Sequence, residues 1–159
     1  MQPEAPLTRF LPYQLSLASN AVSGRIAHEY RSRWSLSVPE WRVMAVIGDF
    51  GPMTQRDLTE LTLMDKVAVN RACKALEDRQ LISRTPNEQD GRSHLLALTG
   101  AGEEMHGQIM PLAREMERRI CDGFSEQELD LFREMLGRLH RQSELVDAAD
   151  IPSDSFGVS

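Results

Sequence analysis

Apolar residues recur every three or four positions in the first part of the chain, which is the spacing of one face of a helix. The positions concerned are Leu15, Ala18, Val22, Ile26 and Tyr30. They predict a helix that begins near Pro12, a residue suited to a first helical turn, and ends near Arg33.

The same spacing predicts two more helices toward the C-terminus. Their apolar positions are Met105, Ile109, Leu112, Met116 and Ile120, and then Leu129, Phe132, Met135, Leu136 and Leu139. Pro111 lies inside the first of these helices and can bend it. The last residues, DIPSDSFGVS, lack any such pattern and are expected to be a disordered tail.

Capping patterns indicate where the helices begin. Ser37 with Glu40 has the spacing of a capping box, and it predicts a helix from Val38 that ends at Gly51. Ser125 with Glu128 repeats the box, Thr54 with Asp57 repeats it in a weaker form, and Asp65 can cap a helix by itself. The helices predicted from these signals in the middle of the chain cover residues 38–50, 55–61 and 65–79.

Strand signals are limited to two short segments, LISRT at 81–85 and HLLAL at 94–98. The polar stretch PNEQDGR separates them, so they predict a β-hairpin with a long loop. The expected order is helix, helix, short helix, helix, hairpin, helix, helix, which is mainly α. The short helix, the tight connection TLM and the helix at 65–79 form a helix-turn-helix, and the hairpin after it makes a winged form.

The second helix of this motif is predicted to have an apolar and a polar face. The apolar positions are Val69, Ala72, Cys73 and Leu76, and the polar ones are Lys66, Asn70 and Lys74 with Arg71 beside them. Lysine and arginine donate to phosphates or guanine, and asparagine can bind adenine, so this face suits the major groove of DNA. A merely solvated helix face is the alternative interpretation.

The hairpin loop favours the DNA-binding interpretation. Arg92 near its tip could enter the narrow, electronegative minor groove of A·T-rich DNA. Asp90 could hold the guanidinium of Arg92 through a charge-assisted hydrogen bond.

Composition and charge are compatible with this prediction. The 159 residues suffice for one domain with helical extensions and exclude two large domains. The net charge of -6 seems unfavourable for binding DNA, but residues 52–98 carry seven basic and seven acidic residues, and residues 99–159 carry the excess of acid. No apolar run approaches the ~20 residues that cross a membrane and the N-terminus lacks a signal-peptide pattern, so a cytoplasmic location without membrane contact is expected.

Residues 36–99 resemble the MarR family of bacterial transcriptional regulators. The segment DGRSHLLALT fits that family's wing pattern, Asp-x-Arg followed by five residues and Leu-Thr, with Asp90, Arg92, Leu98 and Thr99 in the matching places. The flanking helices also fit in length and order. One departure is Gln80, where the family commonly has a glycine that ends the recognition helix in a left-handed conformation.

The resemblance implies a homodimer bound to double-stranded DNA at a palindromic operator. Residues 1–36 and 100–148 would form the dimerisation helices, residues 37–99 the winged helix-turn-helix, and 149–159 the tail. Arg92 would enter the minor groove with Asp90 orienting it. The further implied DNA contacts are Lys66, Asn70, Arg71 and Lys74 in the major groove, Thr54, Gln55 and Arg56 at phosphates, and Arg84 as a weaker candidate.

The resemblance also implies regulation by a small aromatic acid or phenol, which would release a repressor from DNA. Candidate ligand contacts are Tyr13, Ser16, Asn20, His28, Trp41, Arg42 and Met44, most of which are also explained by ordinary packing. The alternatives are redox regulation through Cys73, although a buried structural thiol explains Cys73 and Cys121 better, and a winged-helix module that binds proteins instead of DNA. The scattered histidines and the absence of catalytic motifs predict a non-enzyme without metal or cofactor.

Overall fold

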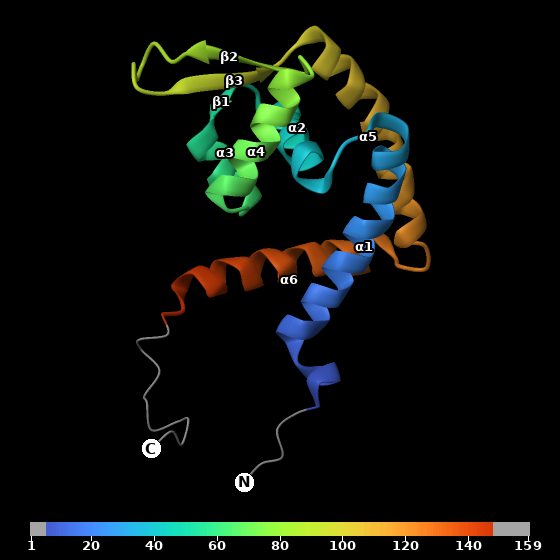
Figure 1. Cartoon of the computed structure of the whole chain (residues 1–159). Coiled ribbons are helices and arrows are strands. Elements are labelled where there is room, and N and C mark those ends of the chain that lie inside the picture. Colours follow the sequence, from blue (N-terminus) through green and yellow to red (C-terminus); the bar gives the residue numbers. More distant parts are fainter. Residues whose placement is uncertain (1–5, 148–159) are drawn as a thin grey trace. The chain divides into compact units, whose positions relative to one another are not determined.

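A computed structural model describes residues 6–147 of the chain (Figure 1). A short 3-10 helix, Leu7–Arg9, precedes α1 at Leu11–Trp34 and α2 at Val38–Phe50. The middle of the chain forms β1 (Met53–Thr54), α3 (Gln55–Thr62), α4 (Lys66–Asp78), β2 (Ile82–Pro86) and β3 (His94–Leu98). The last elements are α5, Gly100–Ile120, and α6, Glu126–Leu145. The predicted order of helices and hairpin is confirmed, while the expected tail at 149–159 lies outside the described residues.

The capping patterns act as predicted at the starts of four helices. Complete capping boxes join Ser37 to Glu40, Thr54 to Asp57 and Ser125 to Glu128. The Thr54 box was predicted to be the weak one, yet the Thr54 hydroxyl makes an additional hydrogen bond of 2.7 Å to Asp57 Oδ2. Asp65 caps α4 by accepting a hydrogen bond of 2.8 Å from the backbone N–H of Ala68. Local side-chain chemistry therefore sets the helix boundaries around the helix-turn-helix.

The hairpin belongs to a sheet of three strands in the order β1-β3-β2, and all its neighbouring strands are antiparallel. The sequence predicted β2 and β3 but not β1, because two residues are too few to show an alternating pattern. Met53 of β1 lies opposite Leu96 of β3, and both side chains are buried. The strand β1 thus fastens the start of α3 to the base of the wing, and the hairpin of β2 and β3 extends beyond α3 and α4 (Figure 1).

The core lies between the sheet and the helices of the winged helix. Its fully buried side chains include Leu36, Val43, Met44, Leu58, Val69, Cys73, Leu76, Leu96 and Ile109. Ile109 comes from α5, so the first half of that helix packs into the winged-helix core. Gly102 in the first turn of α5 is buried against the backbone carbonyl of Leu81, and a β-carbon there would collide with that oxygen.

The chain divides into two compact units, one through Glu117 and one from Arg118 onward. The boundary falls inside α5, in the stretch after the turns that pack on the winged helix. The described part of the second unit contains the end of α5 and α6, and α6 has no buried residue. Amphipathic spacing without burial leaves the apolar positions of α6 open to solvent in a single chain.

Candidate nucleic-acid interface

Helix α4 has the two faces that its sequence predicts. Val69, Ala72, Cys73 and Leu76 are buried. The candidate DNA contacts Lys66, Asn70, Arg71 and Lys74 are exposed. Because the apolar face anchors α4 to the core, the polar face is presented outward on a rigid helix.

A hollow of about 370 Å³ lies between the start of α3 and the wing. Six of the sequence-predicted DNA contacts line it: Thr54, Gln55, Arg56, Arg84, Asp90 and Arg92. Asn87, Ser93 and His94 complete its wall, and none of these three was predicted. The hollow forms because β1 places the first turn of α3 beside the hairpin, a pairing that the sequence did not reveal.

A second hollow, of about 410 Å³, lies between α3 and the start of α4. Gln55, Arg56, Thr59, Glu60 and Lys66 line it. Gln55 and Arg56 line both hollows, so the two hollows adjoin at the start of α3. We refer to the two hollows together with the exposed face of α4 as the reading surface.

The electrostatics of the reading surface favour an anionic partner. Among residues 6–147, the cationic groups of Lys66, Arg71 and Arg92 form no ion pair. Arg56 pairs with Glu60 at 3.2 Å and Lys74 with Asp78 at 3.7 Å, but these pairs are widely exposed to solvent. Exposed pairs of this kind contribute little free energy, so both cations can exchange their partner for a phosphate.

The wing tip is held by hydrogen bonds between side chains and the backbone. Asn87 Oδ1 accepts from the backbone N–H of Gln89, and Asp90 Oδ1 accepts from the backbone N–H of Arg92 at 3.1 Å. The expected hydrogen bond between Asp90 and the Arg92 guanidinium is not formed among the described residues. An Asx turn satisfies the carboxylate locally, so Asp90 positions the backbone of Arg92 and leaves its guanidinium available.

Arg84 pairs with Glu77, a residue that the sequence reasoning missed. Arg84 Nε donates to Glu77 Oε1 at 2.8 Å and Nη2 donates to Oε2 at 3.1 Å. These hydrogen bonds lower the pKa of Glu77 and raise that of Arg84. The spacing of Asn70, Lys74 and Glu77, four and then three residues, was the available signal that an acid shares the polar face.

Cys73 lies in the core beneath the reading surface and is fully buried. Burial raises the pKa of its thiol to about 11. The thiol is therefore protonated at neutral pH and is a poor nucleophile. Cys121 is also free but only half-buried, so the expectation of two buried thiols holds for Cys73 alone.

The candidate ligand contacts are divided between surface and core. Trp41 and Met44 are buried, and the Trp41 ring packs against Tyr30 at 5.9 Å and His106 at 5.8 Å between centroids. The other candidates, Tyr13, Ser16, Asn20, His28 and Arg42, are exposed. The packing interpretation therefore explains Trp41 and Met44, whereas the five exposed residues remain predictions.

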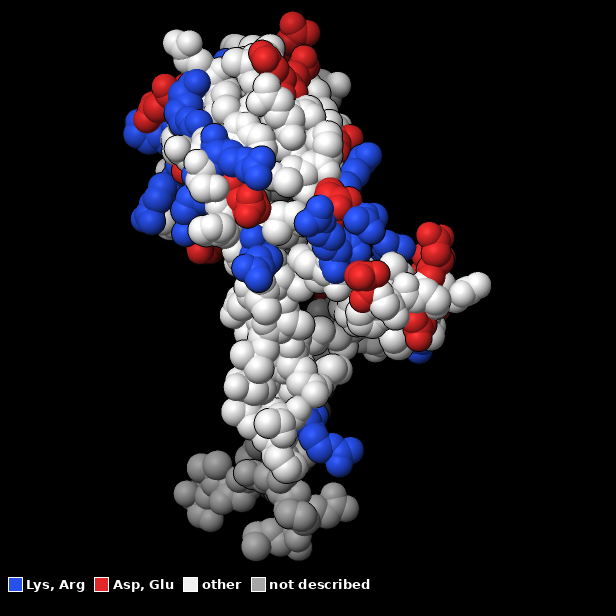
Figure 2. All heavy atoms as spheres, turned by 90° about the vertical axis from the view of Figure 1, so that its right-hand side faces the viewer, with Lys and Arg blue, Asp and Glu red and all other residues white. Residues whose placement is uncertain are grey.

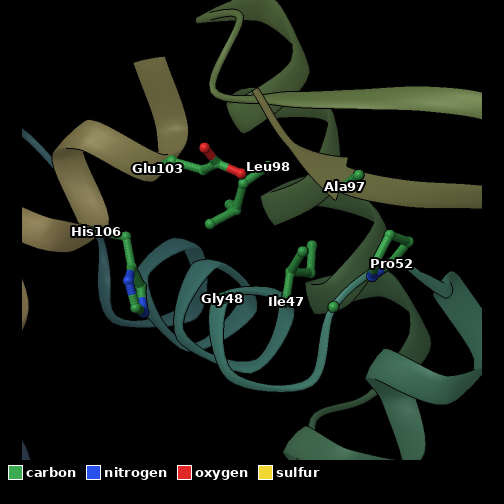
Figure 3. Close-up of a pocket in the computed structure, with 8 residues that line it drawn as sticks. Ile47, Gly48, Pro52, Ala97, Leu98, Glu103 and His106 are labelled. Atoms are coloured by element: carbon green, nitrogen blue, oxygen red, sulfur yellow. The ribbon is translucent and has the colours of Figure 1, made fainter. Parts of the chain in front are cut away.

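A pocket of about 330 Å³ lies between α2, β3 and α5, away from those candidates (Figure 3). Ile47, Pro52 and Leu98 supply apolar walls, and Glu103 and His106 come from α5. The buried Nε2 atom of His106 has no hydrogen-bond partner and lies against Gly48, where a β-carbon would collide with the ring. His106 and Gly48 both belong to the lining of the pocket.

Among residues 6–147, no three His, Cys, Asp or Glu side chains are grouped as a metal ion would require, and no helix is long and apolar enough to cross a membrane.

Comparison with known proteins agrees with the fold. A sequence model of the MarR family matches residues 34–93. YwoH of Bacillus subtilis, an uncharacterised HTH-type transcriptional regulator, is 24% identical over 79% of this chain and 90% of its own. A MarR/EmrR family regulator from Acinetobacter sp. ADP1 superposes with a TM-score of 0.83 at 22% identity, covering 89% of this chain and all of that one.

A mutant of MarR from E. coli, solved in complex with operator DNA, superposes with a TM-score of 0.73 at 20% identity over 86% of this chain and 99% of its own. Residues 34–93, which the family model matches, include most of the winged helix that carries the reading surface. The chain thus carries a MarR-family winged helix-turn-helix region at residues 34–93, within the fold of solved MarR-family transcriptional regulators.

Proposed function

We propose that this regulator is a cytoplasmic, homodimeric repressor that binds a palindromic operator and is released by a small aromatic acid or phenol. The observation that carries the DNA-binding half of the proposal is the reading surface. Its cations Lys66, Arg71 and Arg92 have no acidic partner among the described residues. Arg92 and Lys66 each line one of the two hollows, and Arg71 is exposed on α4. Such cations stabilise a complex by replacing the counterions of DNA phosphates.

Each part of the reading surface has its own role in the proposed complex. Arg92 enters the minor groove, and Asp90 positions its backbone through the Asx turn. The exposed face of α4 enters the major groove, with Lys66, Asn70, Arg71 and Lys74 as contacts. Thr54, Gln55 and Arg56 begin α3, where the positive end of the helix dipole favours a phosphate.

The exposed apolar positions of α1 and α6 support the homodimer. Residues 10–24 contain no charged side chain, and this stretch forms a long white section below the charged upper part of the molecule in Figure 2. Leu17 and Val22 in this stretch, and Phe132, Met135 and Leu136 on α6, are all exposed in the single chain. A second copy would bury these positions on each helix, since exposed apolar side chains of this extent mark an interface.

A symmetric dimer gives a geometric expectation for the operator. Its two copies of α4 can enter successive major grooves on one face of DNA when the half-sites are about 10 base pairs apart. The ligand would bind between α1 and α2, where exposed Tyr13, Ser16, Asn20, His28 and Arg42 are the contacts we propose. Arg42 could pair with a carboxylate of the ligand.

Binding to the DNA upstream of the regulator's own gene tests the proposal. Fluorescence anisotropy at several salt concentrations should show tight binding. The logarithm of the association constant should fall linearly with the logarithm of the salt concentration. Arg92→Ala should weaken binding at least tenfold and reduce that slope by about 0.9 for each protomer, since one phosphate-region charge is lost. Arg25→Ala removes the same charge from α1, outside the reading surface, and should leave both quantities unchanged.

Two results would contradict the proposal. If Arg92→Ala binds as tightly as the wild type at every salt concentration, the wing does not contact DNA, and a protein-binding module becomes the better hypothesis.

The ligand half of the proposal is tested by thermal shift with a panel of aromatic acids, because a ligand that binds the folded state raises the unfolding midpoint. No shift at millimolar concentration would argue against an aromatic effector.

A further inference from the structure

Three side chains of the reading surface form a chain of hydrogen bonds in which donation runs in one direction, from Arg84 through Gln55 to Asn70. Arg84 Nη2 on β2 donates to Gln55 Oε1 on α3 at 3.5 Å, and Gln55 Nε2 donates to Asn70 Oδ1 on α4 at 3.3 Å. Arginine has donors only, so the oxygen of Gln55 must face Arg84 and its amino group must face Asn70. Asn70 must then direct its oxygen toward Gln55 and its own amino group away.

The first member of this chain is itself fixed. Glu77 accepts two parallel hydrogen bonds from Arg84, and their side chains are only 28% and 33% exposed. Bidentate pairs of this kind set the plane of the guanidinium as well as its position. The Lys74–Asp78 pair on the same helix is 76% and 66% exposed and has no such geometry.

The positive charge of Arg84 is consequently neutralised by Glu77 within the protein. Glu77 follows Asn70 by seven residues and lies on the polar face of α4, where a bare carboxylate would repel DNA phosphates. Pairing with Arg84 removes that repulsion. Arg84 therefore adds no free positive charge to the reading surface, in contrast to Lys66, Arg71 and Arg92.

We infer that Arg84 is a specificity-determining positioning residue, which sets the amide orientation of Gln55 and through it makes Asn70 present its amino group to the base edges. This inference rests on the proposed reading of the major groove by α4. An amino group can donate to the N7 atom of a purine, to O6 of guanine or to O4 of thymine, but cannot accept from the amino group of cytosine or adenine. Arg84 thus contributes discrimination at the base pair that Asn70 reads.

The decisive variant is Glu77→Gln/Arg84→Gln, which removes one negative and one positive charge and leaves the net charge of the surface unchanged. The operator is first obtained by selecting DNA from a random pool with wild-type protein. Anisotropy is then measured for the operator and for each of its single-base variants. We expect a wild-type salt slope, together with a loss of about tenfold in discrimination at one base pair of each half-site.

Two further variants separate positioning from charge. Lys74→Gln removes an exposed cation, so the salt slope should fall by about 0.9 for each protomer while discrimination is retained. Gln55→Ala breaks the chain at its middle and should cause the same loss of discrimination as the double variant. Combining Gln55→Ala with the double variant should add nothing to that loss, because members of one chain are not additive.

The inference is overturned by any of three results: full discrimination in the double variant, a salt slope reduced by about 0.9 for each protomer in that variant, or additive losses with Gln55→Ala. Circular dichroism checks that each variant folds. If the double variant does not, Arg84→Lys replaces it, since lysine can pair with Glu77 as a point charge but cannot make the same forked contacts. If wild-type protein selects no preferred sequence at all, the proposed function fails, and the role of Arg84 fails with it.

Discussion

The hydroxyl of Thr99 donates a hydrogen bond of 2.7 Å to the backbone carbonyl of Gln80. The hydroxyl oxygen of Thr99 also accepts a hydrogen bond of 3.1 Å from the backbone N–H of Gly102, in the first turn of α5. The side chain of Thr99 thus connects Gln80, just after the end of α4, to the start of α5. This double role gives a physical reason for a threonine at the end of the wing pattern.

Replacing Thr99 with valine should destabilise the protein. The change keeps the shape of the side chain but removes a helix cap and a hydrogen bond, so we expect the free energy of unfolding to fall by about 1–2 kcal/mol. Urea denaturation measures this difference. Thr99→Ser keeps the hydroxyl and is the matched control, with less than half of the loss expected.

Replacing Gln80 with glycine should stabilise the protein. Gln80 has a φ of 58°, in the left-handed region, where a residue with a β-carbon costs on the order of 1 kcal/mol relative to glycine. Gln80→Gly should raise the free energy of unfolding by up to about that amount. Gln80→Ala keeps a β-carbon and should be close to wild type, so equal stabilities of the glycine and alanine variants would contradict the strain argument.

The thiol of Cys73 should resist alkylation in the folded protein. Its pKa of about 11 leaves almost no thiolate at pH 8, whereas half-buried Cys121 should react with iodoacetamide. Mass spectrometry of the alkylated peptides distinguishes the two sites, and in denaturant both should react. Rapid labelling of Cys73 in folded protein would revive the redox hypothesis.

The raised pKa of Cys73 also gives a pH dependence with a definite sign. The thiol ionises near its ordinary value of 9.0 in the unfolded chain but only near 11 in the folded one. The unfolded state therefore loses its proton first, and the free energy of unfolding falls as the pH rises from about 9 toward 11. Cys73→Ala should show a smaller fall over this range in denaturation experiments.

Replacing Phe132 with aspartate should weaken the proposed dimer. Phe132 lies on α6 and is 52% exposed in the single chain, so the substitution should leave the chain folded and place a charge in the interface. Sedimentation at several concentrations should show the dimer dissociation constant rising on the order of thirtyfold or more, as for the central residue of an interface. Gln127→Glu on the same helix adds the same charge at a polar position and should have little effect.

The elements that the sequence predicted were those set by nearby residues. Ser37 with Glu40 and Ser125 with Glu128 are three residues apart, and the helix starts that they predict are confirmed. The alternation of HLLAL predicted a strand at the bounds observed for β3. The two residues of β1 were missed because Met53 and Thr54 become a strand only by pairing with Leu96 and Leu95.

The candidate site divides in the same way. The exposed face of α4 followed from helical spacing, and the wing arginine from a short motif. The hydrogen-bond chain from Arg84 through Gln55 to Asn70 joins residues 29 and 15 positions apart, so no local pattern could indicate it. Asp90 was expected to bind the guanidinium of Arg92, but its carboxylate accepts a hydrogen bond from the backbone N–H of Arg92 instead.

The sequence by itself determined where helices begin, which of their faces are apolar, and that a wing with an arginine in its loop follows a helix-turn-helix. Capping, periodicity and turn chemistry act over a few residues, so a local pattern can reveal them. Tertiary structure alone decided that β1 brings α3 beside the wing, that Cys73 is held protonated, and that Arg84 is committed to Glu77. These outcomes depend on which distant side chains share a desolvated space, and hydrogen bonds and pKa values respond to that neighbourhood and not to separation along the chain.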